Sequence, residues 1–173
     1  MSRKVLIRNA RPEDRDAIRD VTLAAYQEYA PRMPGFWEGY RENIVASLAD
    51  VGSAEQLVAE QDHAVVGTVL LYPPRRMKLS RAASLDMPWP EVRLLAVLPA
   101  ARGRGVGAAL MRECMQRVRS SGGRVLSLHT TDLMQTALRM YERMGFVRAA
   151  ELDFTPEPGV MVKGYRLDLE KAG

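Results

Sequence analysis

One segment of the chain constrains its fold more than any other. Residues 91–128 join an apolar run, a loop rich in glycine, a helical pattern and a second apolar run. The runs Glu91–Leu98 and Val125–Leu128 are typical of strands, and Gly105–Ser120 repeats its apolar residues at helical spacing. A strand, a crossover helix and a second strand form a βαβ unit, so we expect these strands to be parallel, with a right-handed connection. The sequence therefore predicts the α/β (α+β) class.

The flanking sequence predicts further strands and helices on both sides of this unit. Pro12-Glu13-Asp14 is typical of a helix start, and the apolar stripe that follows predicts a helix ending near Pro31. At 173 residues the chain is long enough to bury a core, and we expect a single domain over residues 1–173. The other expected elements are strands at 4–8, 148–154 and 160–169, helices at 36–50 and 134–144, a β-hairpin over 56–72 and a long loop at 73–90.

Composition excludes several classes of protein. The chain has one cysteine, Cys114, and two histidines, so no zinc-ligand spacing occurs and we expect no metal. No apolar run approaches the roughly 18 residues that span a bilayer, and the N-terminus lacks the apolar core of a signal peptide. We therefore expect a cytoplasmic protein without a membrane partner. The net charge of +4 is compatible with a polyanionic ligand.

The glycine-rich loop is the best candidate for binding such a ligand. Residues 102–108 read Arg-Gly-Arg-Gly-Val-Gly-Ala and lead into the first turn of the predicted helix. Glycines let backbone amides approach a ligand, and a helix N-terminus favours phosphate. A P-loop is excluded because the chain contains no Gly-Lys-Ser/Thr. Gly103-x-Gly105-x-x-Ala108 satisfies a loose Rossmann fingerprint. This interpretation is disfavoured, because four residues separate the end of the strand at Leu98 from the first glycine, and only 65 residues follow Ala108.

The remaining interpretation is Arg-x-x-Gly-x-Gly at residues 102–107. Together with Leu95-Ala96-Val97 before it and Tyr141-Glu-x-x-Gly-Phe146 after it, this motif resembles the GNAT superfamily of acetyl-CoA-dependent N-acetyltransferases. The resemblance is specific over residues 91–146. It implies a central mixed, mostly antiparallel sheet of about seven strands, with a parallel splayed pair at strands 4 and 5 and about four helices.

The resemblance also implies where acetyl-CoA binds. In this family the pyrophosphate lies on the amides of the glycine loop, and the pantetheine arm pairs with the preceding strand like an added strand. Met134 stands where many members carry an asparagine that contacts the cofactor, and Thr131 or Asp132 could replace it. The implied cofactor-binding residues are Leu95, Ala96, Val97, Arg102, Gly103, Arg104, Gly105, Val106, Gly107 and Ala108.

Three residues are candidates for proton transfer during direct attack of an amine on the thioester. Tyr141 occupies the family's tyrosine position and is the expected acid for the thiolate leaving group, although it could also only pack beside Phe146. Glu91 and His129 each match a position that supplies the base in one branch of the family. Either could also act through a water molecule, and either could instead be a structural polar residue.

The acceptor is expected to be a primary amine on a small molecule or peptide. The family builds its acceptor pocket from the first two helices, the loop before the fourth strand and the C-terminal strands, and a homodimer is possible. The main alternative is an acyl-CoA sensor or regulatory protein without catalysis. We do not expect nucleic-acid binding, because the basic residues alternate with acidic ones. Aromatic candidates for the acceptor pocket are Tyr26, Tyr29, Phe36, Trp37, Tyr40, Trp89 and Phe154.

Overall fold

The computed structural model describes residues 4–172 and divides into two compact units. Unit 1 comprises the chain up to Leu71 together with Leu94–Glu113. Unit 2 comprises Tyr72–Arg93 and the chain from Cys114 onward. No helix in the described range is long and apolar enough to cross a membrane.

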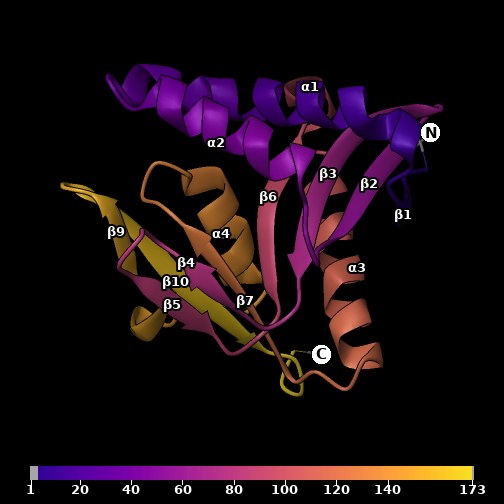
Figure 1. Cartoon of the computed structure of the whole chain (residues 1–173). Helices are drawn as coiled ribbons and strands as arrows, with labels where there is room; N and C mark the ends of the chain where they lie inside the picture. The colour runs from indigo at the N-terminus through magenta and orange to yellow at the C-terminus, as the bar shows by residue number, and fades with distance from the viewer. Residues whose placement is uncertain (1–3, 173) are drawn as a thin grey trace. The chain divides into compact units, whose positions relative to one another are not determined.

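Unit 1 places strands in the order β1-β2-β3-β6 and adds three helices (Figure 1). Helices α1 and α2 contact each other. The predicted stripe of α1 is confirmed, since Ile18, Val21 and Ala25 are all at most 4% exposed. Helix α1 stops earlier than expected and continues as a 3-10 helix over Gln27–Arg32. The elements are β1 (Leu6–Asn9), α1 (Arg15–Tyr26), α2 (Trp37–Ala49), β2 (Glu55–Gln61), β3 (Ala64–Tyr72), β6 (Glu91–Val97) and α3 (Val106–Ser120), the last three extending into unit 2.

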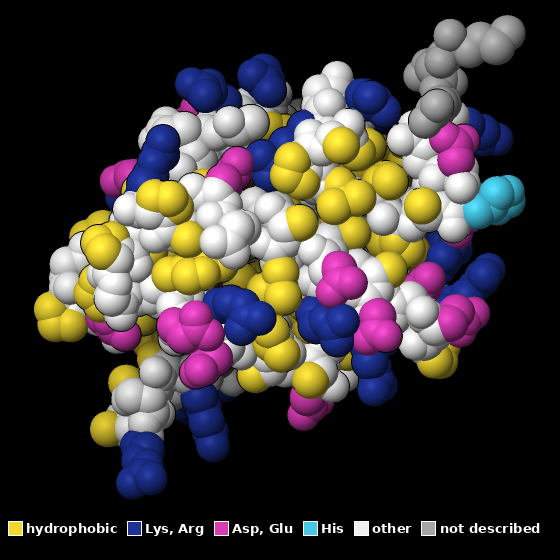
Figure 2. Space-filling view, turned by 90° about the horizontal axis from the view of Figure 1, so that it is seen from above, with side chains coloured by type: hydrophobic (Ala, Val, Ile, Leu, Met, Phe, Trp, Pro, Cys, Tyr) yellow, Lys and Arg dark blue, Asp and Glu magenta, His cyan; other side chains and the backbone are white. Residues whose placement is uncertain are grey.

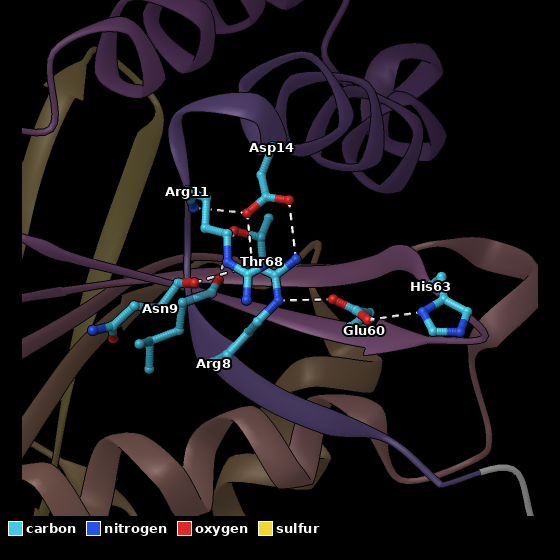
Figure 3. A network of polar contacts seen from close by, with 8 residues as sticks. Arg8, Asn9, Arg11, Asp14, Glu60, His63 and Thr68 are labelled. Carbon is cyan, nitrogen blue, oxygen red and sulfur yellow. Dashed lines mark hydrogen bonds and ion pairs between the residues drawn. The ribbon is translucent and has the colours of Figure 1, made fainter.

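A polar network fastens the first strand of unit 1 to its neighbours (Figure 3). The Arg8 guanidinium donates to both carboxylate oxygens of Asp14 and, through Nε at 2.7 Å, to Glu60 on β2. Asp14 also accepts the backbone N–H of Arg11, which begins the short 3-10 turn before α1. One arginine therefore joins β1, β2 and the entry to the first helix.

Unit 2 contains the order β6-β7-β10-β8, with β9 on β10. Strand β6 pairs with β7 in parallel, as the βαβ pattern predicted, whereas β7 and β10 are antiparallel. Together with the antiparallel pairs of unit 1, this is the mainly antiparallel α/β fold that was expected. The elements are β4 (Arg75–Lys78), β5 (Ser84–Met87), β7 (Val125–Thr130), α4 (Gln135–Arg143), β8 (Val147–Arg148), β9 (Phe154–Glu157) and β10 (Val160–Asp168).

Two expectations about unit 2 were wrong. The stretch 73–90 is not an irregular loop, because β4 and β5 pair there as a separate two-stranded hairpin. Its apolar residues Met77, Leu85, Met87 and Trp89 pack in one cluster with Ala149 and Leu152 of the same unit. Residues 148–154 do not form one strand either. The chain turns through a 3-10 helix at Ala150–Leu152, which buries Leu152 between β8 and β9.

Candidate active site

The glycine loop of unit 1 forms as the sequence predicted. It leaves a 3-10 turn at Pro99–Ala101 and enters α3 at Val106. Gly103 and Gly105 have φ angles of 74° and 78°, in the left-handed region that side chains with a Cβ rarely adopt. Helix α3 is 15 residues long, so its first turn offers free N–H groups and the positive end of a helix dipole. This geometry suits a phosphate.

Arg102 lies at the surface of unit 1, where its side chain is 37% exposed. Its guanidinium donates to the Glu28 carboxylate at 2.7 Å and to the backbone oxygen of Ala25 at 3.1 Å. Its Nε lies 3.4 Å from the backbone oxygen of Val97. Arg102 therefore fastens the glycine loop to the end of α1 and to β6. Arg104, the second arginine of the loop, is exposed.

Strand β6 changes its backbone conformation at Leu94. This residue has a φ of 49°, which is uncommon for a residue other than glycine and costs backbone energy. The register of β6 with β7 covers Glu91 and Val92, both before Leu94. Local strain of this kind concentrates at functional sites, and nothing in the sequence indicated it.

In the segment of β6 after Leu94, one edge faces β3 of the same unit and the other edge faces away from β3. The N–H of Leu98 donates to Val66 of β3, and backbone groups of successive strand residues point to opposite edges. The backbone N–H and C=O groups of Leu95 and Val97 consequently point away from β3. The Tyr26 hydroxyl of α1 donates to the backbone oxygen of Leu95 at 3.2 Å. Ala96, between them, points back to β3.

Unit 2 brings Glu91 and His129 together. His129 Nδ1 lies 2.7 Å from Glu91 Oε1, and His129 Nε2 donates to the backbone oxygen of Leu152 at 2.7 Å. Arg75 Nη2 donates to the other carboxylate oxygen of Glu91 at 2.6 Å. Side-chain exposure is 1% for Glu91 and 9% for His129, so the pair is almost fully shielded from solvent.

The charges around Glu91 keep its carboxyl ionised. Burial alone raises the pKa of Glu91, because a charge is poorly solvated in the interior. The hydrogen bond from His129 and the charges of His129, Arg93 and Arg75 act in the opposite direction and outweigh burial. The pKa of Glu91 therefore lies below its usual value.

Tyr141 lies on α4 in unit 2 and is 6% exposed. Its ring packs edge-on against Phe146, with 5.7 Å between the centroids. The backbone N–H of Phe146 also donates to the backbone oxygen of Tyr141. The turn that ends α4 and the Phe146 ring thus fix the position of this tyrosine.

The segment before α4 differs from the family pattern as expected. Met134 is the residue that precedes the helix, and its side chain makes no capping hydrogen bond. The Asp132 carboxylate pairs with Lys163 Nζ at 2.7 Å. Thr131 Oγ1 is buried and has no hydrogen-bond partner among the described residues. Thr131 is thus the more available of the two suggested replacements for the asparagine.

The aromatic candidates divide between the units. In unit 1 the rings of Tyr29 and Tyr40 each lie about 6 Å from Tyr26, with Trp37 next to Tyr40. Burial, followed by the nearby charge of Glu28, raises the pKa of Tyr29 to about 12, so its hydroxyl remains protonated. In unit 2 Phe154 packs edge-on against His129 and Trp89 packs in the hairpin cluster.

Sequence reasoning missed Arg75 and Tyr26 as polar partners of the site. Arg75 was counted only as one of several basic residues in a proline-rich loop, and Tyr26 only as an aromatic candidate. Pairing of β4 with β5 brings Arg75 to Glu91, and this pairing has no strong periodic signal in four-residue strands.

A strand, a glycine loop and a helix that together present amides to phosphate define a class of cofactor-binding α/β proteins. Comparison with known proteins narrows this class. The model of the acetyltransferase (GNAT) family matches residues 22–146. The chain belongs to this family, an acyltransferase family, as the motifs indicated.

Individual relatives agree with the family model. A GNAT family acetyltransferase from Brucella melitensis, solved in complex with acetyl-CoA, is 30% identical, with a TM-score of 0.61 and 84% of each chain covered. A GNAT-family protein from Desulfovibrio desulfuricans shares the fold with a TM-score of 0.70 at 22% identity, covering 96% of this chain and 99% of that one. The mycothiol acetyltransferase of Nocardia farcinica is 30% identical over 142 residues, or 81% of this chain. The chain spans 39% of the length of the curated relatives that it matches.

Proposed function

We propose that the protein is an N-acetyltransferase that moves an acetyl group from acetyl-CoA directly to a primary amine of a small molecule or peptide. The observation that carries the proposal is the glycine loop of unit 1, whose two left-handed glycines precede the N-terminus of a 15-residue helix. The acetyl-CoA complex of the 30% identical Brucella protein supports the choice of cofactor. The family match over residues 22–146 includes segments of both units, which favours one acetyltransferase domain.

Unit 1 supplies the binding groups for the cofactor. The amides at residues 103–108 would hold the pyrophosphate, and the backbone of Leu95 and Val97, on the edge of β6 that faces away from β3, would pair with the pantetheine arm. A backbone N–H of this strand could also stabilise the oxyanion that develops on the thioester carbonyl, an effect of about 3 kcal/mol in other enzymes. Arg102 positions the loop, since its guanidinium is engaged within the unit.

Unit 2 supplies the groups for proton transfer. Attack by the amine expels a thiolate, and Tyr141 is the proposed acid that protonates it. The amine must lose a proton, and the buried pair of Glu91 and His129 is the proposed base, acting directly or through a water molecule. Both roles use hydrogen-bonding groups that the unit holds in place by packing.

A thermal-shift titration with acetyl-CoA, NAD and ATP tests the cofactor first. A ligand present at 100 times its Kd stabilises the folded protein by about 2.7 kcal/mol. We expect a rise in Tm with acetyl-CoA alone, followed by thiol release in a screen of amines. A shift with NAD instead of acetyl-CoA would reject the proposal.

The second candidate function is acyl-CoA binding without catalysis. The edge-on packing of Tyr141 against Phe146 favours it, because a packed aromatic need not act as an acid. In that case acetyl-CoA binds with equal affinity to the wild type and to Tyr141→Phe, and no amine releases free CoA. Nucleic-acid binding has no support from the surface drawn in Figure 2, where basic and acidic side chains are interspersed.

A further inference from the structure

We propose that Arg75, on the β4–β5 hairpin, is a positioning residue that holds Glu91 and His129 as one charged group in the proton-removal step. This role rests on the proposed acetyl transfer. The three side chains form a chain of contacts, with Arg75 Nη2 on Glu91 Oε2 at 2.6 Å and His129 Nδ1 on Glu91 Oε1 at 2.7 Å. They come from β4, β6 and β7, so the group joins three strands of unit 2.

The hydrogen bonds of the two ring nitrogens of His129 show that this residue does not act as a base by itself. The Leu152 backbone oxygen can only accept, so Nε2 of His129, 2.7 Å away, carries a hydrogen. The ionised carboxylate of Glu91 can also only accept, so Nδ1 carries one as well. A ring that donates from both nitrogens has no lone pair for an amine proton. In this arrangement Glu91 is therefore the member of the pair that retains acceptor capacity.

Arg75 determines which oxygen of the Glu91 carboxylate each partner contacts. A carboxylate that is 1% exposed needs partners, because an unpaired buried charge is costly. Arg75 occupies Oε2 and leaves Oε1 to His129. The guanidinium also stacks on the Tyr72 ring at 4.0 Å, and its Nη1 is buried with no hydrogen-bond partner among the described residues. Its orientation therefore depends on Glu91 and Tyr72.

The β4–β5 hairpin also packs against Leu152, whose backbone oxygen accepts the hydrogen bond from His129. Arg75 pairs in register with Met87, which packs in one cluster with Ala149 and Leu152. The backbone oxygen of Leu152 is the acceptor for His129 Nε2. The hairpin thus supports both ends of the group, one by an ion pair and the other by apolar packing.

The charges near the group fix the sign of the expected pH effect. Burial raises the pKa of Glu91, whereas His129, Arg93 and Arg75 lower it. The Asp153 carboxylate is electrostatically coupled to His129 and is itself paired with Arg148 at 2.7 Å. Removing the positive charge of Arg75 takes away one of the stabilising charges, so the carboxyl of Glu91 protonates at a higher pH.

The pH profile of kcat/KM tests the proposal in Arg75→Gln, Arg75→Lys and the control Arg76→Gln. Arg76 is the neighbour on β4, but it contacts Ser84 and Asp86 at the surface. We expect the acid limb of Arg75→Gln to move to higher pH, with a loss of roughly threefold or more on the acid side and little change at the plateau. Arg75→Lys should restore most of the loss, and Arg76→Gln should match the wild type. An unshifted acid limb in Arg75→Gln overturns the proposal.

NMR of the histidine rings tests the role of Arg75 without an activity measurement. The chain has only two histidines, and His63 is fully exposed, so it serves as an internal reference. We expect Nδ1 and Nε2 of His129 each to carry a hydrogen, as their two acceptors require. Their signals should move in Arg75→Gln and stay unchanged in Arg76→Gln. A bare ring nitrogen in the wild type, or unmoved signals in Arg75→Gln, overturns the proposal. If no amine is acetylated, the proposed function fails, and this measurement still tests the contact.

Discussion

Replacing Gly164 with alanine tests how tightly unit 2 packs beside the proposed base. Gly164 lies on β10 directly opposite His129. A Cβ at this position would lie 2.4 Å from Leu152 Cβ and 2.7 Å from the backbone oxygen of Ala149. Carbon atoms prefer about 3.5 Å or more, so Leu152 would have to retreat by about 1 Å. We expect a loss of about 3 kcal/mol in the free energy of unfolding, at the upper end for overpacking, because one obstacle is backbone.

Urea denaturation measures this loss, and Gly39→Ala is the matched control. Gly39 lies in α2 with no atom within 4 Å of an added Cβ, so alanine should stabilise the protein by up to about 1 kcal/mol through helix propensity. Displacing Leu152 also moves the acceptor of His129 Nε2, so the signals of His129 should shift in Gly164→Ala. An unfolding free energy within about 0.5 kcal/mol of the wild type would refute the packing argument.

Three further predictions concern the cofactor, the acid and the stability in acid. Gly107→Glu places a carboxylate in the phosphate loop and should abolish the acetyl-CoA thermal shift; retained affinity would contradict the loop assignment. Tyr141→Phe should lower turnover by roughly 100-fold with binding preserved, and unchanged turnover would remove it as the acid. The hydrogen bond from Arg8 lowers the pKa of Asp14, so its stabilisation is complete above the unfolded-state pKa and is lost as pH falls through the folded-state value. Asp14→Asn should therefore flatten the fall of Tm between about pH 5 and pH 2, and an equally steep fall would argue against this role.

The sequence was sufficient wherever a long periodic pattern determines the structure. The stripe of α1, the hairpin of β2 and β3 and the run from β6 through α3 to β7 all have clear helical or strand signals. The hairpin of β4 and β5 was missed because four-residue strands with basic and proline neighbours give little periodicity. The turn at Ala150–Leu152 was missed because apolar and polar residues alternate over 150–154, a pattern typical of a strand, although Leu152 is buried from a 3-10 helix instead.

Periodic patterns do not predict the strand register that brings the residues of the candidate site together. A parallel pairing of β6 with β7 follows from the βαβ pattern, but the register does not, and a shift of one residue would place every side chain on the opposite face. The structure places Glu91 opposite Ser127, two residues before His129, and residues two apart on a strand share a face. This register therefore places Glu91 and His129, two separate candidates for the base, where they form a hydrogen-bonded pair. Whether that pair removes the amine proton depends on Arg75, which reaches it from a hairpin that the sequence did not predict.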